Sequence, residues 1–187
     1  MLKKVVLIAA STGGPGELEK ILKKLVSLRE CSIVIAQHMA KEFLPSFAKR
    51  LGEHTTPKVH LIEDGSRLNE GEIFVADAIT TLSSDLRFIK RPSDSSSIYN
   101  PSIDAILGSF APHAQDLKIL CVVLTGIGSD GFLGAYALSQ EGVRVLTQSS
   151  DEAIVDGMPA RIRDGIKEAK VLKTEEIITE IVRFCSV

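Results

Sequence analysis

The sequence predicts an α/β fold: a doubly wound, mostly parallel sheet with helices on both faces and a small antiparallel hairpin insertion. Short, continuously apolar runs alternate along the chain with segments whose apolar residues recur at helical spacing. Continuous apolar runs are typical of strands that are buried on both faces of a parallel sheet. The chain has 187 residues, enough for one sizeable core, so we expect a single domain over residues 1–187.

The first predicted strand and the turn after it organise the chain. Residues 5–10 are all apolar, and Ser11-Thr12 and a glycine-rich turn follow directly. The next segment predicts a helix, because its apolar residues have the spacing i, i+3, i+4, i+7. These residues are Leu18, Ile21, Leu22 and Leu25. Ser11 therefore lies where a buried strand turns into a helix, at the edge where open α/β sheets bind their ligands.

The following segments continue this alternation with one exception. Residues 31–36 predict a second buried strand, which ends at Gln37-His38-Met39. Residues 55–90 instead have the pattern of an antiparallel insertion, because turn signals separate short strands within it. Asn100-Pro101 then predicts the start of a helix, with Asn at the N-cap and Pro at the first helical position.

The second half of the chain returns to strands and helices in turn. Residues 119–124 predict another buried strand, which runs into a glycine-rich turn at residues 125–131 and then into a helix. The pattern is completed by a strand over 143–147, a loop over 149–157, a short edge strand at 171–172 and a last helix from Thr174. This order predicts right-handed crossovers between parallel strands.

Composition and charge argue against several classes of protein. The net charge of −2 lacks the basic surplus of a nucleic-acid-binding protein. We find no run of about 18 apolar residues and no cleavable signal peptide, so we expect a cytoplasmic protein without direct membrane insertion. The cysteines Cys31, Cys121 and Cys185 lack metal-ligand spacing, so we expect buried free thiols, with neither a metal site nor a cofactor.

Three residues with catalytic chemistry follow predicted parallel strands: Ser11, His38 and Asp130. Because the carboxyl ends of parallel strands share one edge of the sheet, we expect the three side chains to meet there. A serine hydroxyl becomes a nucleophile when a base removes its proton, and histidine is the usual base near neutral pH. A carboxylate orients that histidine and stabilises its charged form, so the three residues predict a serine hydrolase.

Each of these residues also has a simpler interpretation. Ser11 and Asp130 are both good helix N-caps, and His38 is also compatible with a structural role. The G-x-S-x-G motif of α/β-hydrolases is absent, while the glycines after Ser11 match neither a dinucleotide fingerprint nor a P-loop. The position of all three residues at one expected edge favours the hydrolase interpretation.

Several motifs in order along the chain resemble the catalytic domain of the CheB family of chemotaxis protein-glutamate methylesterases. The motifs are Ala10-Ser11-Thr12-Gly13-Gly14, Gln37-His38-Met39, Glu63-Asp64-Gly65, Pro101-Ser102-Ile103-Asp104, the turn at residues 125–131 and Gly157-Met158-Pro159. The resemblance covers essentially the whole chain. It implies hydrolysis of methyl esters on glutamate side chains of methyl-accepting chemoreceptor cytoplasmic helices, in chemotactic adaptation. Many members of this family also deamidate receptor glutamines.

The resemblance also implies a role for each residue of the site. Ser11 would be the nucleophile, His38 the base and Asp130 the residue that orients it. The residues expected to bind the substrate or its oxyanion are Thr12, Gly13, Ile127, Gly128 and Met158. Family members usually carry an amino-terminal receiver domain; because the first catalytic strand begins at residue 5, we expect no such domain within residues 1–187.

Three segments at the expected rim of the site depart from the family pattern. Asp77-Ala78-Ile79 replaces a Pro-Gly-Asp segment, and Asn100 and Ala160 each stand where an arginine is usual. These changes leave the substrate preference and the deamidation open. Two alternatives also stay open, a receptor-binding module without turnover and a hydrolase of small esters. The sequence does not indicate an oligomeric state.

Overall fold

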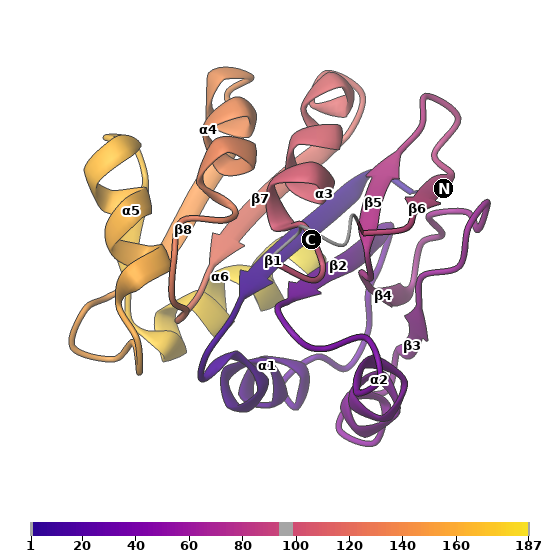
Figure 1. Cartoon of the computed structure of the whole chain (residues 1–187), viewed down its shortest axis with the longest axis horizontal. Helices are drawn as coiled ribbons and strands as arrows, with labels where there is room; N and C mark the ends of the chain where they lie inside the picture. Colours follow the sequence, from indigo (N-terminus) through magenta and orange to yellow (C-terminus); the bar gives the residue numbers. More distant parts are fainter. Residues whose placement is uncertain (1, 94–98, 187) are drawn as a thin grey trace.

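The computed structural model describes residues 2–93 and 99–186, and within them seven parallel strands form one central sheet (Figure 1). The strands are β1 (Lys4–Ala10), β2 (Cys31–Gln37), β3 (Lys58–Leu61), β4 (Glu72–Val75), β7 (Lys118–Val123), β8 (Arg144–Gln148) and β9 (Lys170–Leu172). Their order is β3-β4-β2-β1-β7-β8-β9, and every pair is parallel. The chain thus builds outward in both directions from β1, which confirms the predicted doubly wound sheet.

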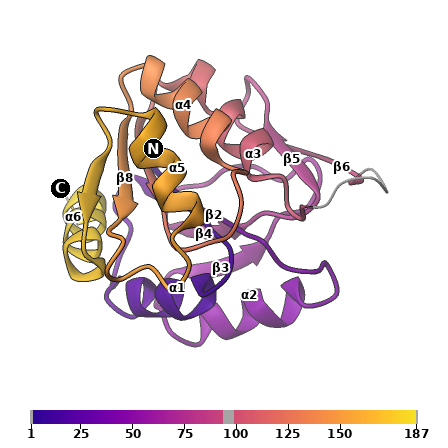
Figure 2. The ribbon, with the colours of Figure 1, turned by 60° about the vertical axis from the view of Figure 1, so that its left-hand side comes forward.

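Helices cover both faces of this sheet, as the sequence predicts (Figure 2). One face carries α1 (Gly14–Leu22), α2 (Leu44–Gly52) and α6 (Thr174–Ser186), and the other carries α3 (Ile103–Ser109), α4 (Phe132–Gln140) and α5 (Gly157–Gly165). A short 3-10 helix, η1 (Ala111–His113), follows α3. All residues of β1 are buried, and its side chains alternate between the two cores: Val6 and Ile8 pack on the first face, Val5 and Leu7 on the second.

The expected antiparallel insertion is smaller than predicted. Only β5 (Ile79–Leu82) and β6 (Phe88–Arg91) form an antiparallel pair, whereas β3 and β4 belong to the parallel sheet. The prediction for residues 55–75 was wrong because β3 is a short edge strand with partly exposed residues. Such a strand lacks the continuous apolar run that marks a central parallel strand.

The start of α3 also differs from the prediction. The N-cap is Ser102, whose Oγ accepts a hydrogen bond from the Ala105 N–H at 3.3 Å, and the helix begins at Ile103. Asn100 does not cap this helix, because its side chain has partners in two other loops. Its Oδ1 accepts from the Ala78 N–H at 3.1 Å, and its Nδ2 donates to the Met39 carbonyl at 2.9 Å.

The three cysteines are buried free thiols, as expected. Two of them meet in the fold although they are far apart in the sequence. The Sγ atoms of Cys31, at the start of β2, and Cys185, in α6, lie 3.3 Å apart. None of the helices in the described part of the chain has both the length and the apolar character needed to span a bilayer.

Candidate active site

The parallel pairing of β1 and β2 places Ser11 and His38 next to each other. Ala10 on β1 is the register partner of Gln37 on β2. Ser11 directly follows Ala10, and His38 directly follows Gln37. The His38 N–H donates to the Ala10 carbonyl at 3.0 Å and extends the ladder by one step. Asp130 lies in the turn between β7 and α4, and β7 pairs with β1 on the side opposite to β2.

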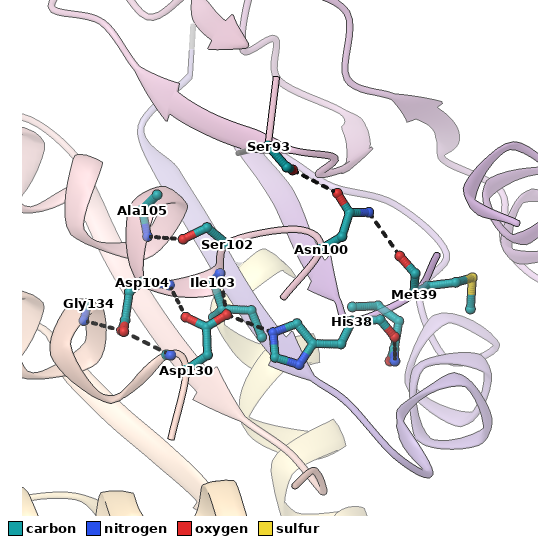
Figure 3. Close-up of polar contacts among 12 residues, drawn as sticks. His38, Met39, Ser93, Asn100, Ser102, Ile103, Asp104, Ala105, Asp130 and Gly134 are labelled. Carbon is teal, nitrogen blue, oxygen red and sulfur yellow. Dashed lines mark hydrogen bonds and ion pairs between the residues drawn. The ribbon is translucent and has the colours of Figure 1, made fainter. Parts of the chain in front are cut away.

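His38 and Asp130 form the central contact of the site (Figure 3). Nε2 of His38 lies 2.7 Å from Oδ2 of Asp130, and the two side chains are only 10% and 5% exposed. The ring of Tyr99 stacks on the imidazole, with centroids 4.8 Å apart and an angle of 10° between the planes. Since Nε2 faces the carboxylate, Nδ1 is the nitrogen that remains to accept a proton.

The Asp130 carboxylate is held by backbone groups as well as by His38. Oδ2 also accepts from the Ile103 N–H at 2.9 Å, and Oδ1 accepts from the Asp104 N–H at 2.8 Å. Burial by itself raises the pKa of Asp130, but the hydrogen bonds from His38 and the two N–H groups outweigh it and bring the pKa below its usual value. Asp130 therefore carries the negative charge that stabilises an imidazolium.

Ser11 is buried directly after β1. Its backbone is hydrogen-bonded to the segment that follows β7 on one side and to β2 on the other. Its N–H donates to the Thr125 carbonyl at 3.0 Å. Its carbonyl accepts from the Gln37 side chain at 2.8 Å, and the same Gln37 Nε2 donates to the His38 carbonyl at 2.9 Å. Gln37 therefore holds the backbone at Ser11 against the backbone at His38.

No hydrogen bond joins Ser11 Oγ to His38 or to any other residue in the described ranges. The two residues nevertheless line the same cavity of about 400 Å³, together with Met39, Ala40, Tyr99, Asn100 and Ile127. Catalytic hydrogen bonds are often long without substrate and shorten to roughly 2.6–3.2 Å in the reacting complex. The hydroxyl is thus free to turn toward a base or a substrate.

The simpler interpretations of Ser11 and Asp130 as caps of the helices that follow them do not hold. The N-cap of α1 is Gly13 and the N-cap of α4 is Gly131, and neither helix has a side-chain cap. Asp130 instead accepts the N–H groups at the start of α3, which lies on a different segment.

Two glycine-rich turns bring the backbone close to Ser11. A Cβ atom on Gly126 would lie 2.7 Å from Ser11 Cβ and 2.3 Å from Met158 Sδ, so only glycine fits there. Gly13 and Gly128 have φ angles of 84° and 88°, which favour glycine. Among residues 2–93 and 99–186, no acceptor is recorded for the N–H groups of Thr12, Ile127 or Gly128. Such unpaired donors can stabilise an oxyanion.

The predicted site residues therefore occupy four kinds of position. Ser11, His38 and Ile127 line the cavity, and Asp130 supports His38 from behind. Thr12, Gly13 and Gly128 lie in the two flanking turns. Met158 is buried under the second turn, and its N–H donates to the Gly126 carbonyl at 2.8 Å. It supports this turn without lining the cavity.

Sequence reasoning missed Gln37, Tyr99 and Asp104 as parts of the site. A signal existed for Gln37, because it is a polar residue at the end of an otherwise apolar strand, immediately before His38. Tyr99 had no such signal, because its contact with His38 joins segments 61 residues apart (99 − 38).

Comparison with known proteins shows the family of this chain. The family described as CheB methylesterase matches residues 6–181. The chain belongs to the CheB methylesterase family. The CheB methylesterase catalytic domain of Thermotoga maritima has a similar crystal structure, with a TM-score of 0.85 and 28% identity, over 98% of this chain and 99% of that one.

Curated CheB relatives are similar over nearly the whole chain. A protein-glutamate methylesterase/protein-glutamine glutaminase of Saccharophagus degradans is 33% identical over 186 residues, 97% of this chain and 50% of the relative. One of Pseudomonas putida is 35% identical over 184 residues, again 97% of this chain and 50% of the relative. The chain thus spans about half the length of the curated relatives it matches.

Proposed function

We propose that the chain hydrolyses methyl esters of glutamate side chains on the cytoplasmic helices of methyl-accepting chemoreceptors, as a cytoplasmic enzyme of chemotactic adaptation. Residues 1–187 would act as one catalytic domain. The observation that carries the proposal is the His38–Asp130 pair, 2.7 Å apart, beside the unpaired hydroxyl of Ser11 in one cavity. Membership of the CheB family and the names of the curated relatives support the choice of substrate.

The reaction begins when Ser11 Oγ attacks the ester carbonyl and His38 Nδ1 takes the hydroxyl proton. The negative charge that develops on the carbonyl oxygen is stabilised by the unpaired N–H groups of the turns, with Ile127 as the leading donor. Removing one donor of this kind costs about 3 kcal/mol in other enzymes. Asp130 stabilises the imidazolium of His38 at the same time.

The tetrahedral intermediate collapses when His38 returns its proton to the methoxy oxygen, so that methanol leaves and an acyl-serine remains. A water molecule then attacks the acyl carbonyl, and His38 takes its proton. Collapse of this second intermediate returns the proton to Ser11 and releases the glutamate side chain as a carboxylic acid, which then ionises in water. Ester and water have become carboxylic acid and methanol, with the enzyme unchanged. A glutamine amide reacts in the same way and releases ammonia.

The test is Ser11→Ala, measured as methanol release from a methylated receptor fragment. We expect the rate to fall to background while the thermal unfolding temperature stays close to that of the wild type. Ser46→Ala is the matched control, because this exposed serine on α2 donates its hydroxyl to the Phe43 carbonyl and does not line the cavity. It should release methanol at the wild-type rate. Near-normal release by Ser11→Ala would refute the assignment of the nucleophile.

Two further measurements separate the alternatives. A receptor-binding module without turnover would bind the fragment but form no acyl-serine with an ester-type inhibitor. A hydrolase of small esters would act on a small chromogenic ester and release no methanol from the receptor fragment. The same fragment with glutamine at its modification sites tests deamidation, read as ammonia release.

A further inference from the structure

We propose that Asp104 is a positioning residue that holds the His38–Asp130 pair in its reactive geometry. The kinetic part of this inference rests on the proposed function, whereas its structural part does not. Asp104 lies in the first turn of α3, on a segment separate from those that carry Ser11, His38 and Asp130. It does not line the cavity, so it acts through Asp130.

Asp104 contacts the Asp130 segment through both its backbone and its side chain (Figure 3). Its N–H donates to Oδ1 of Asp130 at 2.8 Å. Its own Oδ1 accepts from the N–H groups of Gly131 and Gly134, each at 2.9 Å. Asp130 is therefore held on both sides: its carboxylate by the start of α3, and the residue after it by the Asp104 carboxylate.

The backbones of α3 and α4 lie so close together that no larger side chain could fill the place of these hydrogen bonds. A Cβ atom on Gly134 would lie 2.6 Å from Leu107 Cβ, and one on Gly131 would lie 2.9 Å from Ile103 Cγ2. The backbones of α3 and α4 thus face each other with no room for larger side chains. Without the Asp104 carboxylate, the N–H groups of Gly131 and Gly134 would lose their acceptor in a partly buried place, which is costly.

The geometry of Asp130 leaves it little tolerance for movement. Its Oδ2 accepts from the Ile103 N–H at 2.9 Å and from His38 at 2.7 Å. If the backbone at residue 131 shifts relative to α3, Oδ2 cannot keep both bonds at good length. His38 then loses its partner when the imidazolium forms. The loss affects the transition state more than substrate binding, so we expect kcat to fall with little change in KM.

The experiment compares Asp104→Ala with Asp104→Asn and with the control Ser102→Ala. Asn keeps an oxygen at the position of Oδ1, so it can still accept from both glycine N–H groups. Ser102→Ala removes the side-chain N-cap of α3, two residues before Asp104, without removing a hydrogen bond to Asp130. Two quantities are measured for each protein. One is kcat and KM for methanol release; the other is the proton NMR signal of the His38 imidazole N–H, which lies downfield when hydrogen-bonded to a carboxylate.

We expect Asp104→Ala to lower kcat roughly 10- to 100-fold, as displacements of reacting groups do in other enzymes, and to weaken or abolish the downfield signal. Asp104→Asn should keep both the rate and the signal, and Ser102→Ala should keep the signal. If Asp104→Ala does not fold, Asp104→Ser replaces it, because its shorter side chain cannot reach both N–H groups.

Two results would overturn the inference: an unchanged signal and kcat in Asp104→Ala, or a loss in Asp104→Asn as large as in Asp104→Ala. The NMR signal requires no turnover. An intact signal pattern in a protein that releases no methanol would therefore count against the proposed function and not against the role of Asp104.

Discussion

Asp104 and Asp130 each accept hydrogen bonds from the backbone that carries the other. The Asp130 carboxylate accepts from the N–H groups of Ile103 and Asp104, and the Asp104 carboxylate accepts from those of Gly131 and Gly134. The exchange joins the starts of α3 and α4 beneath His38. The two carboxylates differ in ionisation: burial raises the pKa of Asp104, whereas for Asp130 the hydrogen bonds from His38 and the backbone outweigh burial and lower the pKa.

The first prediction concerns the pH dependence of stability. Burial raises the pKa of Asp104 above 3.8; the Gly134 N–H opposes the shift, and the charge of Asp130 adds to it. A carboxyl group with a raised pKa in the folded protein destabilises the fold once it ionises, so stability falls as pH rises from 3.8 through the raised pKa. Asp104→Asn removes this loss, and we expect it to gain stability relative to wild type over that window.

Urea unfolding of both proteins at a series of pH values measures this difference. Because the pKa of Asp130 is lowered, its contribution to stability changes with pH in the opposite direction. The contribution is present above pH 3.8 and is lost as the pH falls through the lowered pKa. That residue is present in both proteins, so its contribution largely cancels. A stability difference that does not vary with pH would contradict the prediction.

The second prediction concerns the space around Ser11. Gly126→Ala adds a methyl group that would lie 2.7 Å from Ser11 Cβ and 3.1 Å from Ser11 N. The Met158 thioether can move aside, but these Ser11 atoms move only with the backbone. We expect a loss of about 1–3 kcal/mol in the free energy of unfolding and a fall of roughly 100-fold in kcat/KM. Gly16→Ala is the control, because nothing lies within 4 Å of its added methyl group. Wild-type activity in Gly126→Ala would contradict the prediction, because it would show that the turn can move to accommodate the methyl group.

The third prediction concerns the Tyr99 ring that stacks on His38. Tyr99→Leu removes the flat face that lies 4.8 Å from the His38 ring, whereas Tyr99→Phe keeps it. A stacking energy of about 0.5–1.5 kcal/mol implies a fall of roughly 2- to 10-fold in kcat for the leucine variant. Tyr136→Leu, at a half-exposed tyrosine of α4, is the control. Equal losses in the leucine and phenylalanine variants would point to the hydroxyl group instead of the stacked ring.

The fourth prediction concerns the thiols. Burial raises the pKa of Cys121 to about 12, so almost no thiolate exists near neutral pH. We expect a chromogenic disulfide reagent to react with Cys121 only after the protein is unfolded by guanidinium. Cys121→Ser lacks this thiol, so the difference in reagent absorbance between it and the wild type is the reaction of Cys121. Rapid labelling of Cys121 in the native protein would be incompatible with its burial.

The sequence alone was sufficient for the central strands of the sheet and for the edge at which the candidate site lies. Continuous apolar runs report strands that are buried on both faces, and this signal located β1, β2 and β7. Parallel strands end at a common edge, so Ser11 and His38 could be expected to lie next to each other before any coordinates were known. The signal failed for the edge strand β3, whose residues are only partly buried.

Only the tertiary structure determined what surrounds those residues. It revealed that Asp130 binds the start of α3 and not α4, that Tyr99 covers the His38 ring, and that Asn100 joins two loops without capping a helix. The physical reason is that apolar periodicity reports the burial of each segment. Hydrogen bonds between segments far apart in the chain depend on how close the packed helices bring their backbones, and here glycines allow α3 and α4 to meet.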